Sequence, residues 1–479
     1  MLKTFKRYNI AALMLIGLLN SSCDKELSKL PANDRVGETA ITDLASAKMA
    51  LNGVYFRFAN VDNDNTANWV YNNTTGGLLS GTLSHGLGPL PEEDNDNVNS
   101  NSPIFQWEYA YKIVLAANGL LRGVEALPEA KLPGAAKTEL SGEARFLRAY
   151  GHFKLLMYFA EWKDLNSVNG VLIRDEFSSL SNIPKKRSSV KDSYTHILAD
   201  LDYAIEHAKL ENPNYYVNKW SAKVLKMRVL ACRGLDADLN ALLLLADDVI
   251  QHSPYTLEPD VRDIFQLKGL QSKEVILGIK PQPGQEVYYN NLSRFYFPMA
   301  DRLFTTNLKF KELLNDDPRQ AWMVGADAPF QMYSPDTYYF HKFIAAGTEP
   351  TQTSETQYAI RLSEVYLLKA EAIIRSKSDY TEAKAALKLL MERAGINDFS
   401  ALDQITSKEA LWKFYTTEVL KSFAGEDGIE WFTLIRMPLS LITEIRPNIT
   451  KNEQLYFPIP QSELDLNKNF GEQNQGYGL

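Results

Sequence analysis

Three polar segments of the chain combine aromatic side chains with amides and charged groups. The residues of interest are Trp69, Tyr71, Asn72 and Asn73 in residues 60–73, Tyr288, Tyr289, Asn291, Arg294 and Tyr296 in residues 282–296, and Tyr338 and Tyr339 in residues 322–342. Aromatic rings can stack on the C–H faces of sugars, and amides and carboxylates make directional hydrogen bonds to hydroxyl groups. The three segments therefore predict a carbohydrate-binding surface.

Two other roles are compatible with the same composition. The rings could pack the loops onto the rest of the protein, and tyrosines with asparagines could also bind a peptide. Trp69 and the Tyr288–Tyr289 pair are the strongest candidates for ligand contact because they lie among polar residues. The aromatic residues expected in the core, because they lie in helical patterns, are Trp107, Phe146, Phe153 and Trp412.

No sequence motif for catalysis or metal binding is evident. The chain has no Gly-x-Ser-x-Gly elbow and no His-Glu-x-x-His motif. Asp62-x-Asp64 and Asp94-x-Asp96 begin like calcium loops but lack glycine at position six and glutamate at position twelve. A surface glycoside hydrolase stays an alternative, because spacing along the chain cannot reveal two facing carboxylates. We expect a binding protein without catalytic activity, cofactor or metal.

The first 23 residues have the pattern of a lipoprotein export signal. Three basic residues precede an apolar run, Ile10 to Leu19, which is too short to span a bilayer. Small and polar residues lead from this run to Cys23. Two or more acyl chains on that cysteine, such as palmitate, would give stable membrane anchoring. We expect residues 1–22 to be a signal peptide and residues 23–40 to be a lipidated, flexible tether.

The charge of the chain restricts its partners. The net charge of −8 becomes −11 when residues 1–22 and their three basic side chains are removed. Nucleic acid and anionic lipid headgroups are therefore not expected as ligands. If Cys23 is lipidated, Cys232 has no partner for a disulfide and is expected to be a buried, small apolar residue.

Apolar residues recur with helical spacing in many segments. The predicted helices are 39–60, 104–127, 138–162, 189–209, 219–233, 238–251, 359–375, 380–394, 407–423 and 431–436. Between them, residues 60–103 and 254–343 predict loops and short strands, such as Val275 to Ile279. Helix pairs joined by short turns are typical of a tetratricopeptide-like repeat scaffold.

This pattern predicts one mainly α domain with a loop-rich, partly β ligand-binding face. Its expected parts are an N-terminal helical part (41–252) with the loop 60–103, a loop-rich insertion (253–358) and a C-terminal helical part (359–479). A helical scaffold for protein interactions, without a small ligand, is a further alternative. Convergence of the loop aromatics on one face would argue against that alternative.

Six short segments, in family order, resemble the SusD/RagB family of outer-membrane nutrient-binding lipoproteins. They are Cys23 to Leu27 with Pro31 and Ala45 to Tyr55, Gly142 to Tyr158, Arg187 to Ile205, Arg361 to Ala372, Trp431 to Arg436, and Phe457 to Pro460 with Gln473 to Tyr477. One stretch departs from the family pattern. Gly425-Glu426-Asp427-Gly428 lacks the arginines usual before Trp431, which puts its local packing in question.

The resemblance implies about four tetratricopeptide-like helix pairs and ligand-gripping loops near residues 60–73 and 282–296. It implies a ligand that is usually a glycan and sometimes a peptide, and no enzyme activity. It also implies a partner, a SusC-like TonB-dependent β-barrel transporter over which the protein acts as a lid. The implied location is the outer membrane, with the anchored protein facing the cell exterior.

Overall fold

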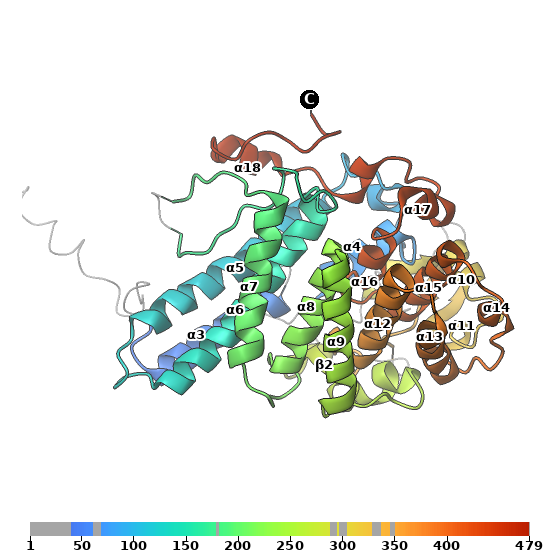
Figure 1. Ribbon diagram of the computed structural model, residues 1–479, viewed down its shortest axis with the longest axis horizontal. Helices are drawn as coiled ribbons and strands as arrows, with labels where there is room; N and C mark the ends of the chain where they lie inside the picture. The colour runs from blue at the N-terminus through green and yellow to red at the C-terminus, as the bar shows by residue number, and fades with distance from the viewer. Residues whose placement is uncertain are drawn as a thin grey trace, which may run out of the picture.

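The computed structural model describes residues 40–60, 69–178, 182–287, 295–296, 304–327, 337–344 and 350–478 (Figure 1). Outside the described residues lie the predictions for the signal peptide, for Cys23 and all but the last residue of its tether, and for Tyr288, Tyr289, Asn291 and Arg294. Helices predominate in the described residues, with a few short strands. This confirms the prediction of a mainly α fold. The proposed boundaries between the parts of the domain stay predictions.

The N-terminal half is a row of long helices packed side by side. They are α3 (Leu44–Ala59), α5 (Ser102–Ala126), α6 (Gly134–Phe159), α7 (Val190–His207), α8 (Lys219–Arg233) and α9 (Asp236–His252). Helix α3 packs on α5 and α6, and from α5 to α9 each helix contacts the next (Figure 1). Their facing sides bury the apolar residues of the helical pattern, including Ala144, Leu147 and Phe153 of α6. Cys232 is also buried, as predicted.

Polar side chains stabilise the first turns of several of these helices. Asp43, Ser189 and Asn218 each accept a hydrogen bond from a backbone N–H three residues further on, at 2.8, 3.0 and 2.9 Å. An N-cap of this kind contributes about 1 kcal/mol. Helix α8 ends at Arg233, and Gly234 caps it with a φ of 69°, which favours glycine. The turn to α9 is therefore short, and the two helices lie side by side.

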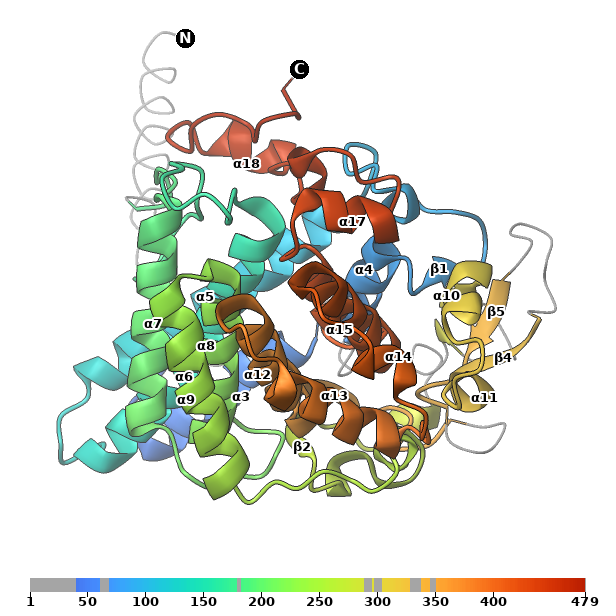
Figure 2. The ribbon, with the colours of Figure 1, turned by 45° about the vertical axis from the view of Figure 1, so that its right-hand side comes forward.

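The C-terminal half continues the row after a long excursion of the chain. The chain leaves α9 at Ser253 and returns with α12 (Leu362–Ser376), which packs directly on α9. Helices α13 (Thr381–Arg393) and α15 (Lys408–Phe423) pack on α12, and α16 (Ile429–Leu434) packs on α15. Figure 2 shows α12 beside α8 and α9, with α13 next to α12. The helical array is the tetratricopeptide-like scaffold that the sequence predicted.

Shorter helical segments and the C-terminal tail complete the fold. The segments are η1 (Pro91–Asp94), η2 (Ile264–Lys268), η3 (Gly269–Gln271), η4 (Gln285–Val287), α10 (Leu308–Leu313), α11 (Gln320–Met323), α14 (Ser400–Asp403), α17 (Leu439–Ile445), η6 (Asn452–Leu455) and α18 (Gln461–Leu466). In the tail, Asn474 donates hydrogen bonds to the carbonyls of Phe159 and Phe457 at 2.9 and 2.8 Å. Arg187 donates to the Asn474 side chain at 2.7 Å. These bonds hold the tail against the end of α6.

The excursion contains strands of two small antiparallel sheets, one of which includes a strand from the N-terminal half. The strand order is β1 (Ser84–His85), β3 (Phe304–Asn307), β5 (Thr337–Phe340) and β4 (Val324–Asp327) in one sheet, and β2 (Val275–Ile279) with β6 (Gln357–Arg361) in the other. In the first sheet, His85 lies opposite Phe304. This pairing joins residues 60–103 to residues 253–358, the two parts predicted to supply the ligand-binding loops.

Residues 60–103 are more regular than their composition predicted, because they contain the helix α4 (Val70–Ser80). Every residue of α4 except Tyr71 is buried. Asparagine, threonine and glycine have low helix propensity, so local sequence does not reveal this helix. Tertiary contacts stabilise it instead. Asn72, for example, donates a hydrogen bond to the Tyr109 hydroxyl at 2.9 Å.

Glycine allows α4 to lie against the N-terminus of α16. A Cβ atom on Gly76 would lie 2.4 Å from the Cα atom of Gly428, much closer than real Cβ contacts. Gly428 has a φ of 73° and directly precedes α16. The position of α4 therefore depends on the absence of a side chain at Gly76.

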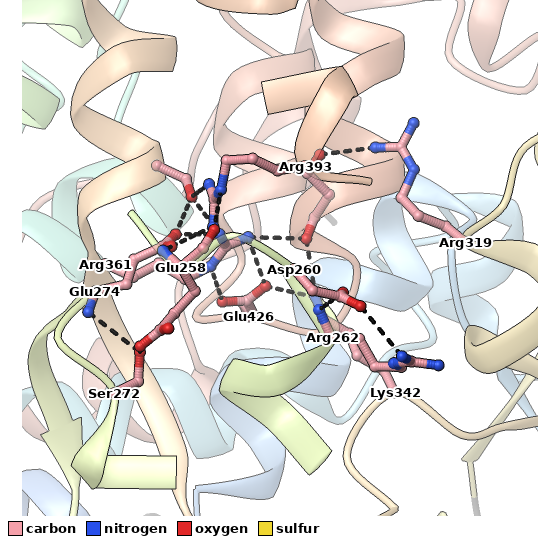
Figure 3. A network of polar contacts seen from close by, with 12 residues as sticks. Glu258, Asp260, Arg262, Ser272, Glu274, Arg319, Lys342, Arg361, Arg393 and Glu426 are labelled. Carbon is pink, nitrogen blue, oxygen red and sulfur yellow. Dashed lines mark hydrogen bonds and ion pairs between the residues drawn. The ribbon is translucent and has the colours of Figure 1, made fainter. Parts of the chain in front are cut away.

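A buried network of charged residues lies where the excursion meets the C-terminal helices (Figure 3). Arg361 donates from Nε to Glu426 at 2.8 Å and from Nη1 to Glu274 at 3.3 Å. Lys342 donates to the other oxygen of Glu426 at 2.5 Å. Each of these four side chains is at most 1% exposed. Removing one partner of a buried pair typically costs about 3–5 kcal/mol, because the other charge is left unpaired.

Asp427, next to Glu426, forms a second set of buried polar contacts. It accepts hydrogen bonds from Lys154 at 3.0 Å, Arg228 at 2.9 Å and the Tyr150 hydroxyl at 2.6 Å. This acidic stretch lacks the arginines of the family pattern. Its positive partners come instead from distant parts of the chain, and the stretch is well packed.

Candidate functional site

A cavity of about 220 Å³ opens where α4, α5, η1 and the β1–β3 pair meet; we call it the α4–α5 cavity. Its lining consists of Val70, Tyr71, Thr74, Thr75, Leu78, His85, Leu90, Pro91, Glu92, Asn99, Asn101, Ser102, Phe105, Phe295 and Phe304. The pairing of β1 with β3 draws Phe304 towards α4 and α5. The cavity is thus formed by segments that lie far apart in the sequence.

Aromatic rings provide flat apolar surfaces in the α4–α5 cavity. The ring of Tyr71 stacks on Phe105, with centroids 4.6 Å apart and an angle of 6° between the planes. Phe105 is 39% exposed, although it lies on a helix, and Tyr71 and Phe295 are half-buried. His85 contacts Phe304 edge-on at 5.8 Å. Such faces suit the C–H surface of a sugar ring.

Glu92 supplies the charged group of the α4–α5 cavity and is only 3% exposed. Its Oε1 atom accepts hydrogen bonds from the hydroxyls of Ser102, at 2.6 Å, and Ser100. Its Oε2 atom is buried and has no hydrogen-bond partner among the described residues. An unsatisfied buried acceptor costs about 1–3 kcal/mol, which a ligand hydroxyl could recover. Asn99 and Asn101 add exposed amides at the rim.

Hydrogen bonds hold η1, and the carboxylate it carries, in a defined position. The Glu93 side chain accepts from the backbone N–H groups of His85 and Leu90 at 2.9 and 3.0 Å. Asn95, at a φ of 55°, donates from its side chain to the Leu79 carbonyl of α4 at 3.0 Å. The polar side of the cavity is therefore preorganised relative to α4.

The structure places three of the four candidates in residues 60–73 in the core. Trp69 is fully buried, and its ring contacts Phe58 with centroids 5.0 Å apart. Asn72 and Asn73 face the core, where Asn73 accepts a hydrogen bond from the backbone of Asp427 at 3.2 Å. Trp69 directly precedes α4, and Asn72 and Asn73 lie on the buried side of this helix. The fourth candidate, Tyr71, lines the α4–α5 cavity.

The described candidates of the other two segments are also buried. Tyr296 is fully buried against Phe340, with centroids 5.6 Å apart, and burial raises the pKa of its hydroxyl. Tyr338 and Tyr339 are 8% and 6% exposed in β5, and the Lys311 ammonium lies 4.0 Å from the centroid of Tyr338. In the structure these three tyrosines pack the insertion, and their contact with a ligand stays a prediction.

Of the lining residues, sequence reasoning named only Tyr71; the polar and aromatic ones that it missed include His85, Glu92, Asn99, Asn101, Phe105, Phe295 and Phe304. Phe105 was overlooked because it lies in a helical pattern, where aromatic residues are usually buried. A signal was present nevertheless, since Asn99 and Asn101 precede it and repeat the mixture of amides and aromatics used elsewhere. The sequence around Glu92 does not indicate a binding role, because only the folded structure shows that its Oε2 atom is buried without a hydrogen-bond partner among the described residues.

The cavity offers recognition chemistry more readily than acid–base chemistry. Among the described lining residues, Glu92 is the only carboxylate, whereas most glycosidases use two. In the part of the chain that the structure describes, no group of three or more His, Cys, Asp or Glu side chains could hold a metal ion. The same residues contain no helix long and apolar enough to cross a membrane.

The fold and the cavity together define a helical-repeat protein with an aromatic-lined cavity. Comparison with known families agrees with this class. A family model described as "Starch-binding associating with outer membrane" matches residues 38–229, and the SusD family model matches residues 293–443. The two matches follow one another and together span most of the chain. The protein belongs to the SusD/RagB family.

Individual relatives are distant in sequence but similar in structure. A SusD-like protein of Bacteroides ovatus is 23% identical over 340 residues, which cover 62% of this chain and 60% of that protein. The crystal structure of a SusD superfamily protein from Bacteroides thetaiotaomicron has a TM-score of 0.73 at 21% identity, covering 90% and 99% of the two chains. A structure described as a laminarin-binding SusD-like protein has a TM-score of 0.69 at 18% identity, covering 91% and 100%.

Proposed function

We propose that the protein binds an oligosaccharide in the α4–α5 cavity. The observation that carries this proposal is the stacked Tyr71–Phe105 pair in one cavity with the unpartnered oxygen of Glu92. The rings would contact the C–H face of a sugar, and the carboxylate would accept a hydrogen bond from a hydroxyl. Asn99 and Asn101 would add hydrogen bonds at the rim.

Two similarities support a glycan as the ligand. The description of the first matching family model names starch binding, and one structural neighbour is described as laminarin-binding.

We propose binding without catalysis, which agrees with the single carboxylate among the described lining residues. A bound oligosaccharide should therefore remain uncleaved after prolonged incubation, as measured by chromatography. Release of shorter products would favour a hydrolase.

We further propose that the protein is anchored to the outer membrane through Cys23 and faces the cell exterior. From there it would deliver its ligand to a SusC-like TonB-dependent β-barrel transporter, with residues 23–40 as a tether. The variant Cys23→Ala should be a folded, ligand-competent protein in the soluble fraction that no longer supports uptake. Loss of folding in this variant would contradict the assignment of the first 40 or so residues.

The binding proposal is tested by native gel electrophoresis in the presence of laminarin, starch, xylan or galactan, with oligopeptides as competitors. We expect retardation by one of these glycans. Phe105→Ala and Tyr71→Ala should weaken binding about tenfold, which corresponds to about 1.4 kcal/mol. The matched control is Tyr366→Ala, because Tyr366 is half-buried on α12 and lines neither the α4–α5 cavity nor its surroundings. Equal binding by Phe105→Ala and the control, or displacement of the glycan by peptides, would contradict the proposal.

A further inference from the structure

A second cavity, of about 340 Å³, lies between α3, the connection from α7 to α8 and the chain after β2; we call it the α3 cavity. The lining residues used below are Asn52, Phe56, Tyr215, Tyr216, Lys280 and Gln282. No residue lines both this cavity and the α4–α5 cavity. Its volume is within the range of small-ligand pockets, roughly 300–1,000 Å³.

Consecutive tyrosines form the aromatic surface of the α3 cavity. The rings of Tyr215 and Tyr216 are 4.8 Å apart between centroids and inclined by 53°. Both are half-buried, and Phe56 adds a third partly exposed ring. Lys280 lies with its ammonium 4.7 Å from the centroid of Tyr215. Two adjoining ring faces beside a hydrogen-bond donor are suited to a sugar.

The backbone that carries the two tyrosines is fixed on both sides. Asn214 accepts a hydrogen bond from Gly278 of β2 at 2.7 Å, and its side chain donates to the Leu270 carbonyl at 2.8 Å. On the other side, the backbone N–H of Val217 donates to the Tyr55 hydroxyl of α3 at 2.8 Å. The tyrosines are therefore held ready for a ligand, which reduces the entropy lost on binding.

Polar side chains at the rim complete the binding surface. Asn52, Lys280 and Gln282 are exposed and offer amide and ammonium groups. The tyrosines lie in the sequence Asn212-Pro213-Asn214-Tyr215-Tyr216-Val217-Asn218. This mixture of asparagine and tyrosine resembles that of residues 288–291, where two tyrosines precede two asparagines.

We propose that the α3 cavity is a second oligosaccharide-binding site, separate from the α4–α5 cavity. Ala59 and Asn60, at the end of α3, line one cavity, and Val70 and Tyr71, at the start of α4, line the other. Binding at two places on one protein would increase its effective affinity for a long polysaccharide beyond that of either site. This inference rests on the proposal that the protein binds glycans.

The test is a calorimetric titration with a hexasaccharide of whichever polysaccharide retards the protein in the gel panel. We expect two binding events for the wild-type protein. Tyr215→Ala should weaken one event about tenfold and leave the other unchanged, and Phe105→Ala should do the reverse. The control Tyr366→Ala should retain both. If Tyr215→Ala disturbs folding, Tyr215→Leu removes the flat ring while keeping apolar packing.

The outcomes separate the two proposals. A single binding event that is lost in Phe105→Ala but unchanged in Tyr215→Ala overturns the second site and supports the first. Loss in Tyr215→Ala with no effect of Phe105→Ala overturns the α4–α5 cavity as the ligand site and supports the α3 cavity. Binding of none of the polysaccharides overturns both.

Discussion

Buried carboxylates have different surroundings in the interior network and in the α4–α5 cavity. Glu426 lies 2.8 Å from an Arg361 nitrogen and 2.5 Å from the Lys342 ammonium. Glu92, which is nearly as buried, has serine hydroxyls on one oxygen and no partner on the other among the described residues. Both regions bury a carboxyl group, but among the described residues only Glu426 is paired with cations.

This difference distinguishes carboxylates that stabilise the fold from the one that we propose to bind a ligand. Paired charges in the interior fix the relative positions of segments that are distant in sequence, and losing one partner is costly. A buried acceptor without a donor lowers the stability of the fold. A ligand hydroxyl that donates to Glu92 would recover this cost, which explains why the acceptor lies at a cavity wall. Changes in the network should therefore affect folding, whereas changes at Glu92 should affect binding.

The largest expected effect is on the network. Arg361→Ala leaves Glu274 and Glu426 short of a cation and should lower the free energy of unfolding by about 3–5 kcal/mol. The matched control is Arg262→Ala, which removes a 50% exposed arginine that pairs with Asp260 at 3.1 Å (Figure 3). That control should cost about 0–1 kcal/mol. Urea denaturation measures both, and similar losses would contradict a special role of the buried network.

A smaller effect is expected where α4 supports the cavity. Gly76→Ala introduces a Cβ that meets the Gly428 backbone and should destabilise the protein by about 1–3 kcal/mol. It should also weaken glycan binding, because α4 carries Tyr71. The control is Gly53→Ala on α3, where a Cβ would meet no atom within 4 Å. Since alanine favours a helix, that control should stabilise by about 0.5–1 kcal/mol. Thermal unfolding that ranks the two variants in the opposite order would contradict this packing.

A further expected effect, on the pH dependence of stability, concerns a buried carboxyl outside the cavity lining. Burial raises the pKa of Glu430 from its ordinary value of 4.5 to about 8. Its contribution to stability is therefore fully present below about pH 4.5 and is lost as the pH rises through about 8. Glu430→Gln stays neutral, so its stability relative to the wild-type protein should increase between pH 5 and pH 8. Parallel curves of unfolding free energy against pH would contradict the raised pKa.

Much of the helical scaffold could be predicted from the sequence, because long amphipathic helices carry their own periodic signal. Residues 219–233 were predicted as a helix and form α8 with the same bounds. Helix α4 could not be predicted, because asparagine and glycine have low helix propensity. Its stability depends on tertiary contacts with Tyr109 and Gly428, which local sequence does not show. Tertiary contacts override propensity there.

The sequence indicated one region that lines the α4–α5 cavity but not which of its residues do so. Composition pointed to residues 60–73, of which Trp69 is buried in the core and Tyr71 lines the cavity. Phe105 and Glu92 acquire their roles only when η1, α4 and α5 come together. Which side of a helix faces a cavity is a property of the assembled fold.

The central claim is that the open oxygen of Glu92 receives a ligand hydroxyl, and calorimetry of Glu92→Gln with the bound oligosaccharide tests it most directly. The substitution keeps the size of the side chain but removes the charged acceptor, which is worth about 1.5–3 kcal/mol. We predict affinity weakened about tenfold or more, with unfolding free energy no lower than that of the wild-type protein. The control Glu108→Gln, at an exposed carboxylate of α5, should bind normally. Wild-type affinity in Glu92→Gln would contradict the account.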